Sequence, residues 1–315
     1  MKWIKEFPPS WFASVMGTGA LAITSKMLSQ DYPLLLKVAK MLAYLNTFLF
    51  IVLLIPWILR WLLYREDALR DLYHPVVSHF YGTIAIAMLI LSANWKLILG
   101  LNEPAYVLWL IGVAMTIGFS LLIPYVMFTQ GEIDTKTLGP AWFIPPVGLI
   151  VIPMTCFYKV DPALLYFSWG SGFFLYLALF SMVMLRFIRH EPMPCGLAPS
   201  IWINLGPIGA GASSYLAIVK GELSFLVVFL WGFGIWWFLM AVMLTLYYIR
   251  KISLPYSLAW WAFIFPLGAY TSATLKVASL LNSSTIKGFG VFLYAMLFVL
   301  WLLTGGRTVI HVVRR

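Results

Sequence analysis

The sequence predicts an all-α integral membrane protein, and three observations lead to this fold class. Apolar residues make up 62% of the 315 residues, whereas charged residues make up only 10%. The mean hydropathy of +0.92 is far above that of a domain whose surface is hydrated. Apolar stretches recur along the whole chain, and none alternates with the period of two that barrel strands show. The chain is therefore expected to lie largely in lipid as helices.

Ten apolar stretches are long enough to cross a bilayer, since a spanning helix needs about 20 residues. Together they occupy most of the chain, so we expect one transmembrane domain over residues 1–315 and no separate soluble domain. The expected segments are Ser10–Met27, Val38–Leu63, Pro75–Leu97, Pro104–Phe128, Gly139–Tyr158, Pro162–Phe187, Gly196–Val219, Leu223–Ile249, Ser257–Leu281 and Ile286–His311.

The basic residues predict the orientation of these segments, because cytoplasmic flanks retain Lys and Arg during insertion. The termini and the even-numbered connections carry 13 Lys and Arg, against 8 on the other side. All nine Arg belong to the first group. We therefore predict cytoplasmic N- and C-termini in a multi-pass protein of the cell membrane, either an inner or a plasma membrane.

Acidic residues are absent from the middle of every expected segment. All 11 lie in connections or at segment ends. A membrane interior without carboxylates repels anions less, and it lacks the acidic group that proton or sodium relays usually employ. This distribution favours the passage of small inorganic or organic anions. Membrane lipids are the other expected partners.

Other functional classes require residues that the chain does not supply. The formal charge of +10 is spread over the connections without the basic run that nucleic-acid binding uses. Cys156 and Cys195 form no metal-type pair, and no Cys/His cluster occurs, so neither a metal nor a cofactor is expected. An enzyme would need paired acids, or a nucleophile with its base. We therefore expect a protein that is not an enzyme.

Helix breakers predict which segments lie inside. Kinked helices persist in a membrane where neighbouring groups satisfy the freed backbone, so we place the odd segments inside and the even segments outside. The expected arrangement is five tandem hairpins around a narrow central pore. Prolines lie in or near the middle of segments five, seven and nine, and glycines replace them in segments one and three: Pro145, Pro146, Pro207, Pro266, Gly17, Gly19 and Gly82.

Several residues are candidates for the pore. Small residues also permit close helix packing, so both roles stay open for the glycines. Lys26 and Lys276 lie towards the outer ends of segments one and nine, where a cation attracts anions; snorkelling to the interface is the alternative. The candidates for pore kinks and lining are Gly17, Gly19, Gly82, Pro145, Gly148, Gly206, Pro207, Gly209 and Pro266.

Three stretches resemble the tellurite-resistance/dicarboxylate transporter family. They are FASVMGTG at Phe12–Gly19, PAWFIPPVG at Pro140–Gly148 and AWWAFIFP at Ala259–Pro266. The similarity runs across all ten segments, and the combination in this order is more specific than any single motif. The family includes bacterial TehA, fungal malate and sulfite transporters, and the slow-type anion channels of plant guard cells.

The resemblance implies five helical hairpins around one pore in each subunit, three subunits per assembly, and a phenylalanine of the ninth helix that occludes the pore. The residue that matches this gate is Phe265, directly before Pro266, and Phe263 is the alternative. A kink at Pro266 aims the preceding ring across the axis. A ring in a narrow apolar pore closes it by steric occlusion and dewetting.

The expected function is gated anion transport through the central pore. The alternative is a carrier, with or without proton coupling, for C4-dicarboxylates such as malate, or for efflux of sulfite or tellurium oxyanions. The sequence does not separate these two modes. The lack of carboxylates inside the membrane nevertheless disfavours tight proton coupling.

Overall fold

Helices account for all the regular structure in the computed structural model, which describes residues 2–222 and 224–314. The predicted all-α class is thus confirmed. Within these residues, six helical stretches are long and apolar enough to cross a membrane. They are α3 (Leu34–Leu63), α6 (Asn102–Thr129), α8 (Pro162–Arg189), α12 (Ser284–Val313), and the extended stretches Ser78–Leu99 and Phe225–Ile252.

Two kinds of helical unit alternate along the chain. The first kind is a 3₁₀ helix that leads into a short α-helix, and the second is a long α-helix. The units of the first kind are η1 (Pro9–Phe12) with α2 (Ala13–Leu28), η2 (Ser78–Tyr81) with α5 (Gly82–Asn94), η5 (Pro140–Phe143) with α7 (Ile144–Met154), η6 (Cys195–Asn204) with α9 (Leu205–Ile218), and η8 (Leu258–Phe263) with α11 (Ile264–Leu280). The long helices are α3, α6, α8, α10 (Phe225–Tyr247) and α12. These units coincide in position with the ten expected segments, although the first residue of the eighth, Leu223, lies outside the described residues.

The five short α-helices form a closed ring. Helix α2 contacts α5, α5 contacts α7, α7 contacts α9, α9 contacts α11, and α11 returns to α2. The 3₁₀ helices close a second ring in the same order, from η1 through η2, η5, η6 and η8 back to η1. We call the 3₁₀/α pairs the inner units.

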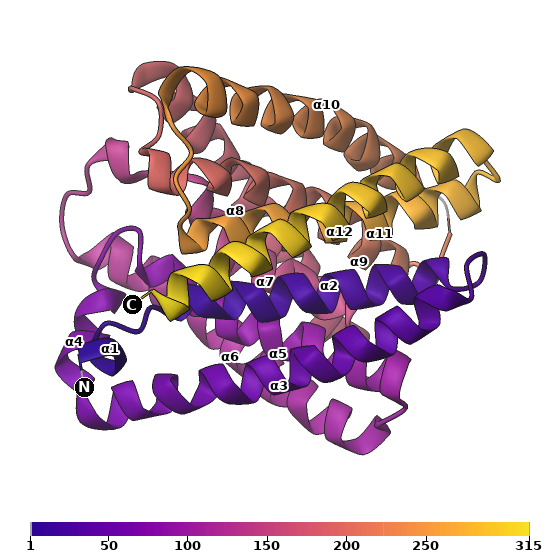
Figure 1. The fold of residues 1–315 in the computed structure, drawn as a ribbon, viewed down its shortest axis with the longest axis horizontal. Helices are drawn as coiled ribbons and strands as arrows, with labels where there is room; N and C mark the ends of the chain where they lie inside the picture. The colour runs from indigo at the N-terminus through magenta and orange to yellow at the C-terminus, as the bar shows by residue number, and fades with distance from the viewer. Residues whose placement is uncertain (1, 223, 315) are drawn as a thin grey trace.

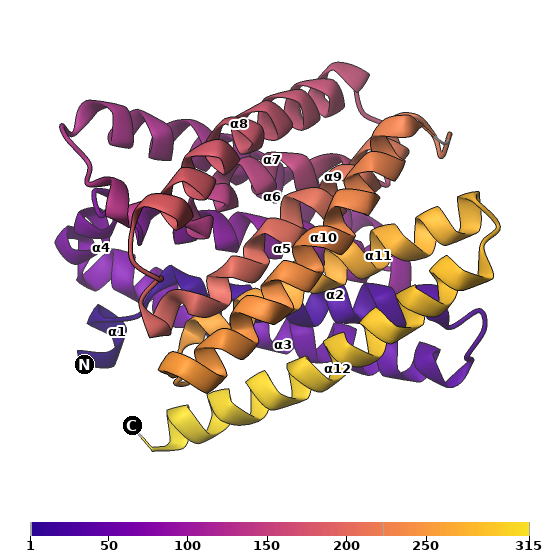
Figure 2. The same cartoon turned by 90° about the horizontal axis from the view of Figure 1, so that it is seen from above.

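Each long helix packs on the inner unit that precedes it, so that α3 covers α2, α6 covers α5, α8 covers α7, α10 covers α9 and α12 covers α11. Figure 1 shows α3 and α10 along opposite edges of the molecule with α2, α7 and α9 between them, and Figure 2 shows the same layering from above. The Ser78–Leu99 stretch is 78% buried, whereas the long helices are 22–33% buried. The predicted division into inner odd and outer even helices is therefore confirmed.

The four candidate prolines of the inner units lie at the starts of the α-helices and not, as the sequence analysis placed them, near helix centres. Pro145 and Pro146 are the second and third residues of α7, while Pro207 and Pro266 are each the third residue of their α-helix. A residue without an N–H costs least in the first helical turn, where amides lack the usual partner. The expected kinks are thus changes from 3₁₀ to α geometry.

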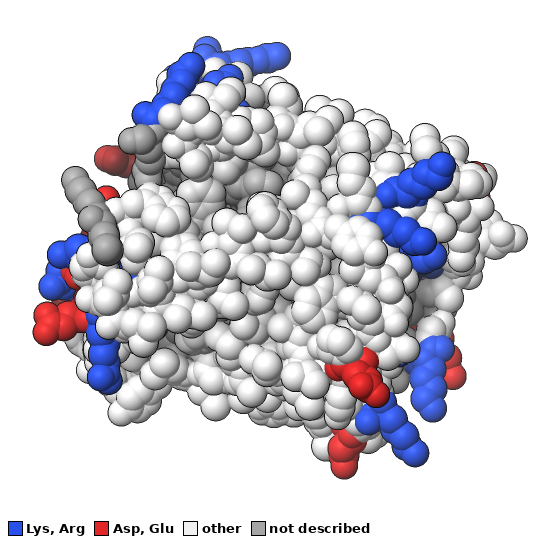
Figure 3. Space-filling model, turned by 60° about the horizontal axis from the view of Figure 1, so that its bottom comes forward, with Lys and Arg blue, Asp and Glu red and all other residues white. Residues whose placement is uncertain are grey.

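The outer surface is suited to lipid. Phe128, Phe174 and Phe225 on three of the long helices are 83%, 72% and 81% exposed. Charged side chains gather at the two ends of the molecule, and the belt between them is uncharged on the face that Figure 3 shows. This pattern matches a hydrocarbon layer flanked by polar interfaces. The chain therefore has the surface of a multi-pass membrane protein.

Both ends of the described chain lie at the same end of the bundle, where α1 (Lys2–Lys5) and the last turn of α12 are found (Figure 1, Figure 2). A further surface helix, α4 (Arg65–Leu72), lies at this end. The buried Arg60 pairs with Asp71 at 2.7 Å and donates to the carbonyls of Lys5 and Phe7 at 2.9 and 3.0 Å. This charge-assisted network ties both surface helices to α3.

Tryptophan side chains join the two helical layers. Trp301 of α12 donates its indole N–H to Thr18 of α2 at 2.9 Å, and Trp231 of α10 donates to Thr274 of α11 at 3.2 Å. An indole N–H without a partner is costly inside a bilayer, so these pairs fix how each outer helix sits on the ring. Other pairs of the same kind are Trp95 with Thr47, Trp109 with Thr155, Trp202 with Thr245, and Trp261 with Thr308.

We predict that Gly209→Ala destabilises the ring while Gly211→Ala does not. A Cβ atom on Gly209 would lie 2.4 Å from the backbone nitrogen of Tyr270, so α9 and α11 would have to separate. On Gly211 it would lie 3.7 Å from Leu230, an ordinary contact. Overpacking of this kind costs about 1–3 kcal/mol. Thermal unfolding of the two purified variants in detergent measures the difference, and equal unfolding temperatures would contradict the close approach.

Candidate functional site

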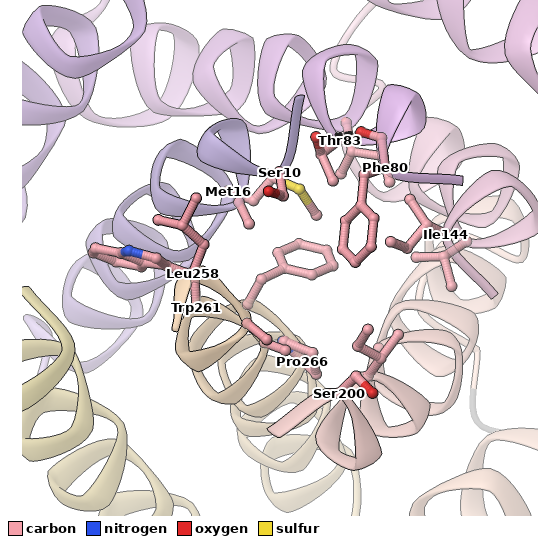
Figure 4. A pocket seen from close by; sticks show the side chains of 17 residues that line it. Ser10, Met16, Phe80, Thr83, Ile144, Ser200, Leu258, Trp261 and Pro266 are labelled. Carbon is pink, nitrogen blue, oxygen red and sulfur yellow. Dashed lines mark hydrogen bonds between the residues drawn. The ribbon is translucent and has the colours of Figure 1, made fainter. Parts of the chain in front are cut away.

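All five inner units contribute side chains to a narrow cavity of about 50 Å³ on the axis of the ring. We call it the central cavity. Ser10, Phe80, Ile144, Ser200 and Phe265 line it, one from each unit. Figure 4 shows that the labelled side chains surround a single space. Because these residues lie in the 3₁₀ helices or the first α-helical turns, the cavity is located where the helix geometry changes.

The lining of the central cavity is apolar apart from a few hydroxyl groups. None of the 17 lining residues is charged. The Thr83 hydroxyl donates to backbone carbonyls, including that of Pro9 at 2.8 Å. The Ser200 side-chain oxygen is buried and has no hydrogen-bond partner among the described residues. The cavity therefore offers neither a fixed charge nor a catalytic acid or base to a solute.

The two candidate phenylalanines occupy different places. Phe265, the second residue of α11, lines the central cavity and is only 4% exposed. Its Cε1 atom lies 3.9 Å from the position that a Cβ atom would take on Gly206. Phe263 packs edge-on against Trp202, with ring centroids 5.5 Å apart, and does not line the cavity. A gating role for Phe265 stays a prediction, but of the two only this ring has the required position.

A second aromatic ring in the central cavity was not among the candidates. Phe80, the third residue of η2, points into the same space (Figure 4). Nothing in the sequence distinguishes it from the other phenylalanines among the 23 of the chain. The feature that could have indicated Phe80 is its position two residues before Gly82, at the junction where η2 becomes α5.

The candidate glycines divide between the cavity and the helix contacts. Only Gly206 lines the central cavity, together with Pro266, whereas Pro145 and Pro207 begin their helices without lining it. At the remaining glycines, a Cβ atom would approach a neighbouring element closely. The closest atoms belong to Ile264 for Gly17, Ile90 for Gly19, Ile144 for Gly82, Thr116 for Gly148 and Tyr270 for Gly209.

A wider cavity of about 440 Å³ opens at the other, C-terminal ends of the inner α-helices. We call it the funnel. Its lining again draws on all five units, with Met27, Ala93, Pro153, Leu216 and Lys276 as representatives. Among the described residues that line the funnel, Lys276 is the one charged side chain, and none is Asp or Glu.

Lys26, the other candidate cation, is half-buried and does not line the funnel. Neither Lys26 nor Lys276 forms an ion pair within the described part of the chain. The structure thus brings one of the two lysines, and not both, to the axial space.

A closed ring of helices around an axial cavity, inside a molecule with an uncharged belt, is the architecture of a membrane transport protein. A family model agrees with this class. The model described as SLAC1, voltage-dependent anion channel, matches residues 6–309 of the chain. The chain belongs to this family.

Three relatives are similar to this chain over most of its length. An uncharacterized transporter of Methanocaldococcus jannaschii is 45% identical, covering 96% of this chain and 92% of the relative. A sulfite efflux pump of Arthroderma otae is 26% identical, covering 97% and 91%. The malic acid transport protein of Schizosaccharomyces pombe is 23% identical, covering 95% and 77%. The resemblance to the tellurite-resistance/dicarboxylate transporters is thereby confirmed.

We predict that Phe263→Ala destabilises the fold more than Phe265→Ala does. Removing a ring from a packed core costs about 3–5 kcal/mol, and Phe263 packs against both Trp202 and Trp260. The ring of Phe265 faces a cavity on one side, so fewer contacts are lost. Unfolding temperatures in detergent rank the two variants. A greater loss for Phe265→Ala would show that its ring is a core side chain.

Proposed function

We propose that each subunit conducts small anions along the axis of the inner ring, and that the Phe265 ring closes this path. In this proposal all ten units cross the cell membrane, both termini are cytoplasmic, and three subunits associate through their outer helices. The observation that carries it is the position of Phe265 in a cavity to which every inner unit contributes. Membership of an anion channel family supports the same function.

The sizes of the two cavities support a closed gate at Phe265. The funnel has a volume of about 440 Å³, and the central cavity has a volume of about 50 Å³. One water molecule needs about 10–15 Å³ of such space, so the central cavity holds a few water molecules at most and has no room for an anion with its full hydration shell. Passage therefore requires the aromatic side chain to move or to be removed.

The electrostatics of the path support anions as its cargo. Within the part of the chain that the structure describes, no acidic side chain lines the central cavity or the funnel. The inner helices all begin at the central cavity, and a helix carries a partial positive charge at its N-terminus. An anion on the axis is thus stabilised by backbone dipoles without a fixed counter-charge that would trap it.

The short inner helices are compatible with ten membrane crossings. The unit formed by η5 and α7 spans only Pro140–Met154, which is shorter than a lipid-exposed helix requires. Its residues are almost all buried within the protein, where irregular backbone is tolerated at membrane depth. A search for membrane-spanning helices by length and hydropathy therefore finds the outer helices more readily than the inner ones.

We expect Phe265→Ala to raise anion flux through proteoliposomes by about tenfold or more, equivalent to lowering the barrier by ~1.4 kcal/mol or more. The physical reason is that the variant removes the ring that fills the constriction. Chloride efflux followed with an ion-selective electrode measures the rate. The control is Phe229→Ala, because this side chain of α10 is 68% exposed on the outer surface. An unchanged flux through folded Phe265→Ala protein would remove the gate from the proposal.

A carrier is the second candidate, because two relatives are named as a sulfite efflux pump and a malic acid transport protein. The two modes differ in counterflow. When proteoliposomes contain unlabelled malate, a carrier takes up labelled malate from outside faster than it does into empty vesicles. An open pore shows no such acceleration. We expect no such acceleration in Phe265→Ala proteoliposomes and no response to a pH gradient, because no carboxylate lines the path. Acceleration by internal malate would favour the carrier.

A further inference from the structure

We propose that Lys276, with Ser272 and Ser279, forms an anion-binding site in the funnel that loads the path with small carboxylates or sulfur oxyanions. This inference rests on the proposed function, since it places a waiting position on the same path. All three side chains belong to α11 and line the funnel.

One face of α11 carries both the gate and this site. Ser272, Lys276 and Ser279 follow Phe265 by seven, eleven and fourteen residues. At 3.6 residues per turn these spacings return to nearly the same side of a helix. With a rise of 1.5 Å per residue, the backbone of Lys276 lies about 16 Å along the helix from that of Phe265. An anion at Lys276 is therefore held in the wide part of the path, away from the constriction.

The charge of Lys276 is available to a solute. Lys276 is half-buried and forms no ion pair within the described chain. Asp31 lines an adjoining pocket that Lys276 also lines. The Asp31 carboxylate forms an ion pair with Lys287 at 2.6 Å. No carboxylate among the described residues that line the funnel neutralises Lys276. An anion from solution is therefore attracted by the unit charge of a partly desolvated ammonium group, against the smaller partial negative charges at the C-terminal ends of the inner α-helices.

The donors around Lys276 indicate the class of ligand. An ammonium group has three N–H donors and no acceptor. The hydroxyls of Ser272 and Ser279 make no side-chain hydrogen bond within the described residues, so both remain free to donate. A carboxylate or sulfur oxyanion has several acceptor oxygens, so it can accept from Lys276 and from one of the two serines at the same time. Ser272 and Ser279 are seven residues apart, about 10 Å along α11, and precede and follow Lys276 on the same face. A halide offers a single acceptor atom, and the site therefore favours oxyanions.

A native cysteine reports the electrical potential at this site. Cys156 lines the same funnel, and its thiol is free. The other cysteine, Cys195, begins η6 at the opposite end of the inner ring. A Cys195→Ser background therefore leaves one reactive thiol beside Lys276. Its rates of reaction with an anionic sulfonatoethyl and a cationic trimethylammonioethyl methanethiosulfonate compare attraction for the two signs of charge.

We expect Lys276→Gln to lower the ratio of anionic to cationic reaction rates about tenfold, because it removes the one charged side chain among the described residues that line the funnel together with the thiol. Lys276→Arg should keep the ratio, because it keeps the charge. Lys26→Gln is the matched control, and it should change the ratio less than about twofold. Lys26 does not line the funnel, and within the described chain it forms no ion pair whose loss would free a carboxylate. An unchanged ratio in Lys276→Gln would overturn the site.

The flux of Phe265→Ala proteoliposomes separates this inference from the proposed function. In that background, adding Lys276→Gln should raise the half-saturating concentration of sulfite several-fold, and that of chloride less. Equal shifts for both anions would overturn the oxyanion preference. If Phe265→Ala carries no flux while the reaction-rate ratio still depends on Lys276, the gate fails and the site stands. If flux is high and the ratio does not depend on Lys276, the site fails and the gate stands.

Discussion

The close approach of five short helices is the constraint on which the rest of the structure depends. Where α9 meets α11, Gly209 leaves no space for a Cβ atom, and Gly17 meets Ile264 of α11 in a similar way. Such contacts bring the five helices close enough together for the side chains of Phe80 and Phe265 to lie in one narrow cavity on the axis. In lipid, where apolar burial drives helix association weakly, packing of small residues and interhelical hydrogen bonds replace it. The Trp–Thr pairs between the layers supply those bonds.

The 3₁₀ segments are a consequence of the same geometry. Each inner unit changes helix type at the level of the central cavity, and prolines occupy the first α-helical turn in three of the five units. The change of geometry places residues such as Phe80 and Phe265 on the axis. The outer helices need no such change, because they only cover the ring and face lipid.

Composition and the positions of breakers predicted the helical class, the alternation of inner and outer helices and the hairpin order. Periodicity could not locate the cavity residues, because the inner helices are apolar on every side and small residues serve packing and lining alike. Gly148 and Gly206 illustrate this, since one meets Thr116 of an outer helix and the other lies beside Phe265. Phe265 was identified only through the family resemblance. Phe80 escaped notice because its role depends on contacts across the ring.

An uncharged axis also explains how a path can admit anions without binding them tightly. The central cavity holds hydroxyls and backbone dipoles, and Lys276, the only lysine among the described residues that line either cavity, lies in the wider funnel. In the proposed function, recruitment at Lys276 and closure at Phe265 thus occur at different levels of α11.

The reversal potential of Phe265→Ala protein in a planar bilayer under a potassium chloride gradient tests the central claim most directly. The account predicts a current that reverses close to the chloride equilibrium potential. A current that reverses close to the potassium equilibrium potential would contradict it.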